Sequence, residues 1–190
     1  MEQPDFAEYQ DYARFYPLTK GVVIINGVLN EGSAAVLQRD ILMALEHSPD
    51  LLRIYITSPG GVVSETMAVH DIIRAISSRG VKCYTIGIGF LASAACSILM
   101  QAGDRRYSYP NTRYMLHELS RSSPEHEKQS ESMDVVAELK RIAEQMETLF
   151  CARTGVDVKR LRKATARKDL HLSAQEALEW GIVDEVTYNI

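Results

Sequence analysis

The sequence predicts an α/β domain with a largely parallel sheet, because strand-like and helix-like segments alternate along most of the chain. Three short apolar runs, at residues 21–27, 51–57 and 81–87, are each followed by a stretch that favours a helix. The chain of 190 residues is long enough to bury one sizeable core. We therefore expect an N-terminal arm at residues 1–19 and a single domain at residues 20–190.

The first half of that domain contains the regular alternation. Apolar residues at helical spacing predict helices over residues 33–46 and 62–76, and a third helix that begins at Ser93. Two short strands are expected over residues 105–109 and 114–116, on either side of a Pro-Asn turn.

A long helix from about residue 124 to residue 153 breaks the alternation. Ser123 is expected to cap it and Pro124 to occupy its first turn. Such a helix predicts a protruding arm or cap that could make oligomer contacts. The remaining predicted elements are a helix over residues 158–164, a helix that runs from the Ser173–Glu176 capping box to Trp180, and a strand over residues 182–186.

Composition and charge exclude several classes of protein. The net charge of −4 and the lack of a Lys/Arg run argue against a nucleic-acid binder. The three cysteines have no metal-type spacing and indicate a reduced, cytoplasmic protein without a metal site. The uncharged run at residues 86–103 contains three glycines and several other small or polar residues, so a buried strand and helix fit it better than a membrane span.

Ser93 is the first candidate catalytic residue. It lies after a strand-like run and at the start of a small-residue, apolar helix. Backbone N–H groups and the positive end of the helix dipole could stabilise an oxyanion at such a position. Serine is also a favoured helix cap, so the position alone does not establish a nucleophile.

Two further features could complete a nucleophilic site. The Ser-Pro-Gly-Gly turn at residues 58–61 could aim a backbone N–H at a developing oxyanion, because adjacent glycines permit close backbone approach. His117 ends a strand-like segment and could act as a general base. The carboxylate that orients it could be supplied by Asp169, Asp184, Asp157 or Glu118, and spacing does not choose among them.

A competing motif is Gly-Ile-Gly-Phe-Leu-Ala at residues 87–92, which matches a dinucleotide-binding pattern. Its mid-chain position and the basic stretch that follows argue against that role. No phosphate-binding Gly-x-x-x-x-Gly-Lys-Ser/Thr motif is present, so the chain should not hydrolyse ATP itself.

Five stretches resemble the ClpP family, the proteolytic subunit of the Clp protease. They are ITSPGGVV at 56–63, GFLASAA at 89–95, AGDRR at 102–106, YPNTRYMLH at 109–117 and LSAQEALEWGIVD at 172–184. They occur in the family's order and span nearly the whole domain. The resemblance implies the ClpP/crotonase-like fold, a protruding helix arm and a peptidase domain over residues 20–190.

The same resemblance implies a catalytic set. Ser93 would be the nucleophile, His117 the general base and Asp169 the third member of the triad. The backbone N–H groups of Gly61 and Ala94 would form the oxyanion hole. No cofactor and no metal are implied.

The implied function is cleavage of unfolded polypeptides inside a ring chamber. The resemblance implies a homo-oligomer of one or two heptameric rings and a separate AAA+ ATPase of the ClpX or ClpA type. The chain departs from the family pattern in Ala94-Ala95 after the serine, in Glu118-Leu119 after the histidine, and in one extra residue before Ser173.

These departures leave other functions open. One is a catalytically impaired ring subunit that acts in assembly or partner binding. Another is a head-maturation protease like those of phages, whose small residues after the serine the chain shares. The third is an acyl-CoA enzyme of the crotonase fold.

Overall fold

The computed structural model describes residues 13–48, 50–119 and 129–190. Strands and helices alternate in its first half, and the pattern changes after β5. The elements in chain order are β1 (Val22–Asn26), α2 (Ser33–His47), β2 (Leu51–Ser58), α3 (Val63–Ser77), β3 (Lys82–Ala92), η1 (Ala95–Leu99), η2 (Met100–Ala102), β4 (Arg105–Ser108), β5 (Arg113–Leu116), α4 (Gln129–Thr154), α5 (Val158–Thr165), β6 (Leu170–Ser173), α6 (Ala174–Glu179) and β7 (Glu185–Val186).

The sheet has seven strands and is parallel except at one pair. Its main path runs β1-β2-β3-β4-β7, and β5 leaves this path by pairing with β3 and with β6. Among the strands that the structure describes, only β5 and β6 pair in an antiparallel way. The predicted α/β class with a largely parallel sheet is confirmed.

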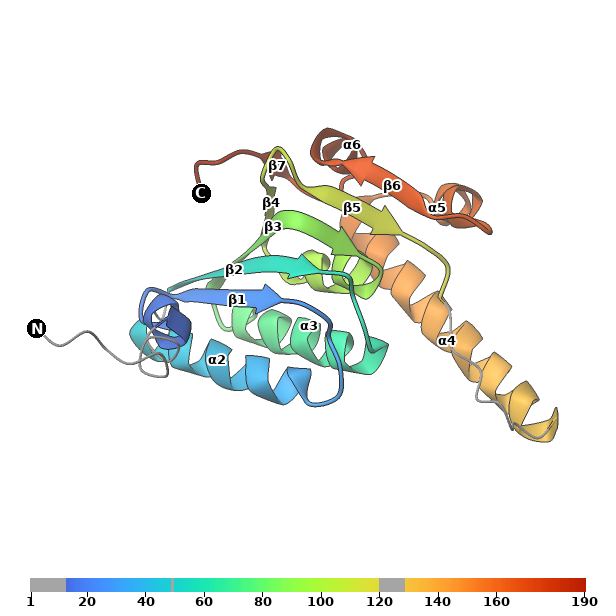
Figure 1. Ribbon diagram of the computed structural model, residues 1–190, viewed down its shortest axis with the longest axis horizontal. Coiled ribbons are helices and arrows are strands. Elements are labelled where there is room, and N and C mark those ends of the chain that lie inside the picture. The colour runs from blue at the N-terminus through green and yellow to red at the C-terminus, as the bar shows by residue number, and fades with distance from the viewer. Residues whose placement is uncertain (1–12, 49, 120–128) are drawn as a thin grey trace, which may run out of the picture.

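Helices α2 and α3 lie together on one face of the sheet, and α4 extends away from the body of the molecule (Figure 1). Burial in β2 alternates strictly, with Leu52, Ile54 and Ile56 fully buried and the residues between them half-buried. This alternation is expected for a strand that has one face on the core and the other face partly in water. The helix-covered face therefore contains the core.

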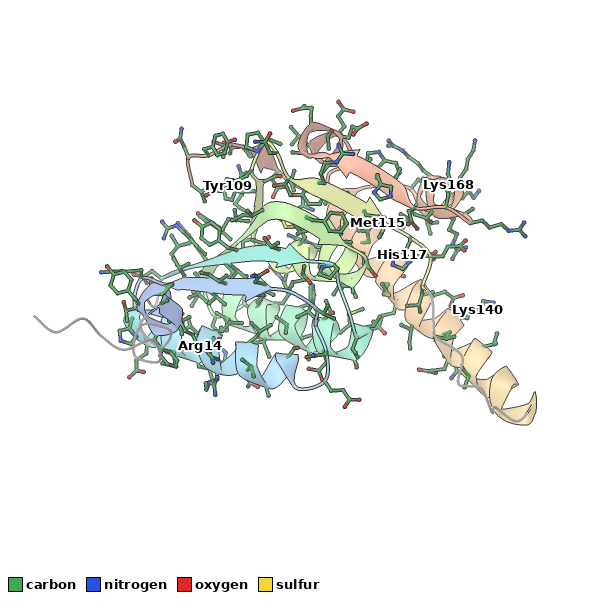
Figure 2. All side chains as sticks on the ribbon, viewed as in Figure 1. Arg14, Tyr109, Met115, His117, Lys140 and Lys168 are labelled. Atoms are coloured by element: carbon green, nitrogen blue, oxygen red, sulfur yellow. The ribbon has the colours of Figure 1, made fainter. Side chains whose placement is uncertain are left out.

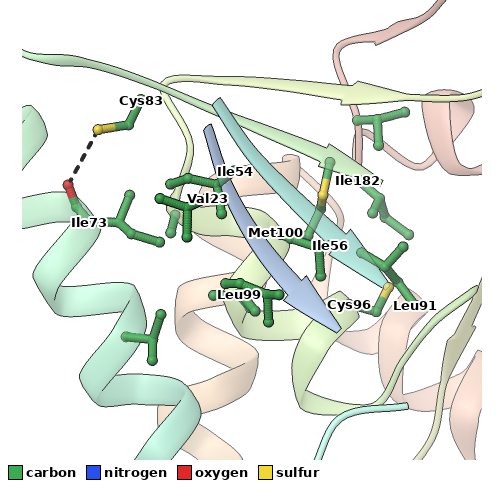
Figure 3. Close-up of a cluster of buried hydrophobic side chains, with 14 of the residues drawn as sticks. Val23, Ile54, Ile56, Ile73, Cys83, Leu91, Cys96, Leu99, Met100 and Ile182 are labelled. Carbon is green, nitrogen blue, oxygen red and sulfur yellow. Dashed lines mark hydrogen bonds between the residues drawn. The ribbon is translucent and has the colours of Figure 1, made fainter. Parts of the chain in front are cut away.

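The core joins the central strands to α3, η1 and η2 (Figure 3). Its labelled side chains are Val23, Ile54, Ile56, Ile73, Cys83, Leu91, Cys96, Leu99, Met100 and Ile182. Burial raises the pKa of the Cys83 thiol to about 12, so this thiol stays protonated and behaves as a small apolar group. None of the described helices is long and apolar enough to cross a membrane.

Strand β3 contains an irregularity, and it pairs with a different neighbouring strand on each side of it. The register with β2 shifts between Ile56 and Ser58. Before the shift, Tyr84 to Gly87 pair with β4, and after it, Phe90 to Ala92 pair with β5. Gly89 lies in the shifted segment at φ 66°, a conformation that glycine adopts at little cost. The shift therefore directs the end of β3 towards β5 and β6.

Several predicted elements differ from the structure. The strand predicted over residues 81–87 extends to Ala92, and the helix expected to begin at Ser93 is a short π-helix, η1, followed by the 3₁₀ turn η2. The strand predicted over residues 182–186 is reduced to β7, because Gly181, Ile182 and Asp184 make turn and loop hydrogen bonds that precede it.

Strand β6 was not predicted at all. The sequence places Asp169 in a loop, and β6 begins directly after it because Leu170–Ser173 pair with β5. The capping box at Ser173 and Glu176 is confirmed. The predicted cap at Ser123 and Pro124 lies outside the described residues, and the described part of the long helix ends at Thr154, before Gly155.

A cluster of arginines attaches the end of α4 to the sheet. The buried Arg106 side chain donates to both carboxylate oxygens of Asp184 and to the Gln101 side chain. Arg153, in the last turn of α4, donates to the carbonyl oxygens of Gln101 and Gly103. These charge-assisted hydrogen bonds satisfy carbonyl groups that would otherwise be buried without partners.

Candidate functional site

Ser93 occupies a strained turn between β3 and η1. Its φ of 54° is left-handed, which is unusual for a residue with a side chain. Its backbone N–H donates to the Met115 carbonyl at 2.9 Å, and its carbonyl accepts from the N–H groups of Cys96 and Ser97. The Ser97 hydroxyl donates to the same carbonyl at 3.0 Å. These contacts fix the backbone, and no described hydrogen bond uses the Ser93 hydroxyl.

The Ser-Pro-Gly-Gly turn packs directly against Ser93. A Cβ atom on Gly60 would lie 2.9 Å from the Ser93 Cβ, and Gly60 has φ 95°. A Cβ atom on Gly61 would overlap the Leu29 carbonyl. The Ser58 hydroxyl accepts from the Gly60 N–H at 3.1 Å and holds the turn. Both glycines are therefore required by close backbone approach as well as by conformation.

Two backbone donors next to Ser93 are not used by the surrounding turns. Hydrogen bonds join the residues on either side of Gly61 to Leu29. The Leu29 N–H donates to the Gly60 carbonyl, and the Val62 N–H donates to the Leu29 carbonyl. Neither the Gly61 nor the Ala94 N–H donates in any backbone hydrogen bond of the described turns and loops. Such unpaired donors beside a hydroxyl suit an oxyanion.

His117 and Asp169 are brought together by the β5–β6 pairing. Leu116 lies opposite Leu170 in the antiparallel register, so the next position places His117 opposite Asp169. Directly opposed residues have Cβ atoms about 4.5–5.5 Å apart. Lys168 lies in the bend before the strand, where its N–H donates to the Thr165 carbonyl. The register, extended by one position beyond the paired residues, thus brings Asp169, and not the lysine before it, across from His117.

The strand ends also bring His117 close to Ser93. Ala92 pairs with Met115 in the parallel β3–β5 register, and the serine follows this pair directly. Figure 2 shows His117 at the end of β5, beside α4. Within the described residues no hydrogen bond joins Ser93 to His117 or His117 to Asp169. The three residues share one end of the sheet without a hydrogen-bonded relay.

Two of the other candidate carboxylates have structural roles instead. Asp184 forms the ion pair with Arg106. The Asp157 side chain accepts from the N–H groups of Lys159 and Arg160 and caps α5. Glu118 is exposed and lies next to His117 in the chain. Asp169 is therefore the candidate that is both free of a described partner and opposite the imidazole.

A cavity of about 510 Å³ opens beside His117, between the sheet and helices α4 and α5. Its apolar lining includes Leu116, Leu139, Met146, Phe150 and Leu161. Ser97, one turn after Ser93, also lines it. A cavity of this size and lining is able to accept a large side chain of a substrate.

The sequence did not single out the cavity or its charged lining. Glu147 and Arg162 come from different helices and form an ion pair at 2.6 Å. The apolar spacing of α4 indicates a buried helix face but not which residues pack against it.

The competing motif at residues 87–92 lies within β3 and so does not form a phosphate-binding turn before a helix. Among the described residues, no group of three His, Cys, Asp or Glu side chains is placed to hold a metal ion.

Comparison with known proteins shows which family the chain is similar to. The family model described as Clp protease matches residues 6–189. The chain is 31% identical over 179 residues to the ATP-dependent Clp protease proteolytic subunit 2 of Treponema denticola, an alignment that covers 90% of this chain and 83% of the relative.

Proposed function

The chain belongs to the Clp protease family, and we propose that it is a serine endopeptidase that cleaves unfolded polypeptides with Ser93 as nucleophile. The observation that carries the proposal is the strained turn at Ser93, packed against Gly60 and near two backbone N–H groups, those of Gly61 and Ala94, that donate in none of the described turn and loop hydrogen bonds. A hydroxyl held at such a turn between a strand and a helix is typical of serine hydrolases.

In the proposed mechanism, Ser93 Oγ attacks the substrate carbonyl carbon and His117 accepts the hydroxyl proton. The N–H groups of Gly61 and Ala94 donate to the oxyanion that forms. His117 then protonates the leaving amine, and water repeats the sequence to release the acyl group. Asp169 orients the imidazole and stabilises its protonated form. Catalytic hydrogen bonds often form only in the substrate complex, so their lack in the free chain is compatible with this scheme.

A fluorophosphonate probe tests the nucleophile. We expect covalent labelling of the wild-type protein at Ser93, identified by peptide mass spectrometry, and no labelling of Ser93→Ala. Ser78→Ala serves as the matched control, because the Ser78 hydroxyl donates to the Ala75 carbonyl at the far end of α3 and should leave labelling intact. Failure of the wild-type protein to react, under conditions in which a related serine protease reacts, would overturn the hydrolase proposal.

We further propose that the chain assembles into one or two heptameric rings and works in the cytoplasm with a separate AAA+ ATPase of the ClpX or ClpA type. The relative's description as the proteolytic subunit of an ATP-dependent protease supports a separation of peptide cleavage and ATP hydrolysis between two kinds of subunit. The domain at residues 20–190 would then be the peptidase unit, and residues 1–19 an arm.

A second candidate function is a ring subunit that binds partners but does not cut. It is favoured by the lack of hydrogen bonds among Ser93, His117 and Asp169 in the described structure and by the position of Asp169 on the exposed surface. Turnover of a fluorogenic peptide by the purified chain, absent in Ser93→Ala, would exclude it.

A further inference from the structure

The cavity beside His117 contains a carboxylate that is neutralised from a neighbouring helix. Arg162 Nε donates to both oxygens of Glu147, at 2.9 and 3.0 Å, and Arg162 Nη2 donates to Oε2 at 2.6 Å. Both residues line the cavity. This two-pronged geometry is the strongest form of side-chain ion pair and fixes the carboxylate in one orientation.

The two partners are unequally exposed. The Glu147 side chain is 23% exposed, whereas the Arg162 side chain is 58% exposed. The carboxylate therefore lies on the inner side of the pair, and the guanidinium covers it from the solvent side. Removing the arginine would leave a partly buried anion in the cavity wall without a described partner.

Within the described residues, Glu147 and Arg162 form the one ion pair between side chains that line the cavity. Its other charged lining residues are Lys140 and Glu118, both exposed, and neither forms an ion pair among the described residues. Two cations and two anions thus line a pocket whose other residues are mostly apolar. Figure 2 shows Lys140 on the protruding part of α4, further from the body of the molecule than His117 at the end of β5.

We propose that Arg162 and Glu147 determine the side-chain specificity of this cavity: by neutralising Glu147, Arg162 makes the cavity select uncharged apolar substrate side chains over basic ones. The proposal rests on the proposed function, since it takes the cavity as the site of a substrate side chain next to the cleaved bond. Its reason is that an unpaired, partly buried carboxylate would attract a cationic side chain.

The test compares peptides that differ only in having lysine, norleucine or glutamate at the residue before the cleaved bond. Norleucine has the four-carbon side chain of lysine and lacks only its terminal ammonium group. Binding is measured by fluorescence anisotropy in the Ser93→Ala background of the full assembled protein, so that the comparison does not require catalysis. We expect the Ser93→Ala protein to prefer norleucine.

The added substitution Arg162→Ala should shift the preference towards lysine by about tenfold, the size expected for one charge-assisted hydrogen bond. Glu147→Gln combined with Arg162→Ala should abolish the shift, because no carboxylate remains. Glu147→Gln alone should act in the opposite direction and favour a glutamate-containing peptide over norleucine, since it frees the Arg162 guanidinium.

Arg141→Ala is the matched control. Arg141 also forms an ion pair, with Glu138 at 3.2 Å, but on the exposed side of α4 and away from the cavity. It should leave both ratios unchanged. Retained norleucine binding by Arg162→Ala would establish that the cavity is still folded.

An unchanged lysine-to-norleucine ratio in Arg162→Ala, or saturable binding of neither peptide, would overturn the proposal. The same peptides measured as substrates with Ser93 intact separate it from the proposed function. Absence of cleavage with Ser93 intact, together with a preserved binding shift, would contradict the protease and leave the effect of Arg162 and Glu147 as a property of peptide binding alone.

Discussion

Ser93 and Gly60 have backbone conformations that only their surroundings explain. A left-handed serine costs on the order of 1–3 kcal/mol, and it persists here because its N–H and carbonyl are held by Met115, Cys96 and Ser97. Gly60 leaves the space that the Ser93 side chain needs. The strain is therefore located at the one hydroxyl that the proposed mechanism uses.

The assignment of Asp169 leads to a prediction at the residue scale. Asp169→Asn should lower kcat for a fluorogenic peptide by about 10³- to 10⁴-fold, because an amide no longer stabilises the protonated imidazole or selects the correct tautomer. Lys168→Gln is the matched control and should change kcat less than about threefold, since Lys168 is the exposed bend residue that precedes Asp169. Equal losses in both variants would contradict the assignment.

At the scale of elements, β3 and β5 fit together through Gly87 and Tyr114. The Tyr114 hydroxyl is buried and has no hydrogen-bond partner among the described residues, and a Cβ atom on Gly87 would overlap it. Gly87→Ala should lower the free energy of unfolding by about 1–3 kcal/mol, the usual cost of overpacking a core. Chemical denaturation of the purified variant measures this change.

Tyr114→Phe should reverse much of that loss. Removing the hydroxyl frees space for the added methyl group and also removes an unsatisfied buried polar atom, so the single Tyr114→Phe change should be nearly neutral or stabilising. The two substitutions should thus be non-additive in a double-mutant cycle. Additive losses would show that the hydroxyl and the Gly87 position do not share this space.

The ion pair between Arg106 and Asp184 connects β4 to the segment before β7. Burial alone would raise the pKa of Asp184, but hydrogen bonds from the Arg106 side chain and backbone N–H outweigh it and hold the pKa below its usual value. A carboxyl group with a lowered pKa in the folded state adds stability above its unfolded pKa of about 3.9. This contribution is lost as the pH falls through the lower, folded pKa.

Asp184→Asn should therefore destabilise the protein most at neutral pH. We expect the free energy of unfolding in urea to fall by about 1–3 kcal/mol at pH 7, a range typical of a lost charge-assisted hydrogen bond. The difference from wild type should shrink as the pH is lowered below about 4. Asp157→Asn, at the exposed cap of α5, is the comparison. A difference that is independent of pH would contradict the linkage.

At the scale of the whole molecule, the chain exposes several large apolar side chains. Those on β1, α2 and the turn between them are Ile24, Val28, Val36 and Leu42. Exposed apolar groups of this kind commonly mark interaction surfaces. They are consistent with the proposed assembly of several copies.

Light scattering after size-exclusion chromatography tests the assembly. We expect a mass several times that of the 21.3 kDa chain at micromolar concentration. Ser93→Ala should have the same mass, since the hydroxyl contributes to the proposed chemistry and not to assembly. A monomeric mass for both proteins would contradict the ring, whatever the outcome of probe labelling.

The amino-acid sequence by itself determined the α/β class, the order of the main elements and the local devices within them. The alternation of apolar runs, the capping box at Ser173 and the glycines at residues 60–61 are all recognisable in short windows. These features depend on backbone preferences and on contacts between near neighbours, so they can be inferred before the chain is folded. The motifs around Ser93 and His117 belong to the same group.

Only the tertiary structure decided which distant residues meet. The pairing of β6 with β5, which places Asp169 opposite His117, depends on a strand register between segments more than fifty residues apart. The shift in β3, the Arg106–Asp184 pair and the Glu147–Arg162 pair likewise join separate elements. Four carboxylates were equal candidates in the sequence because spacing along the chain carries no information about such contacts; packing and register distinguish them.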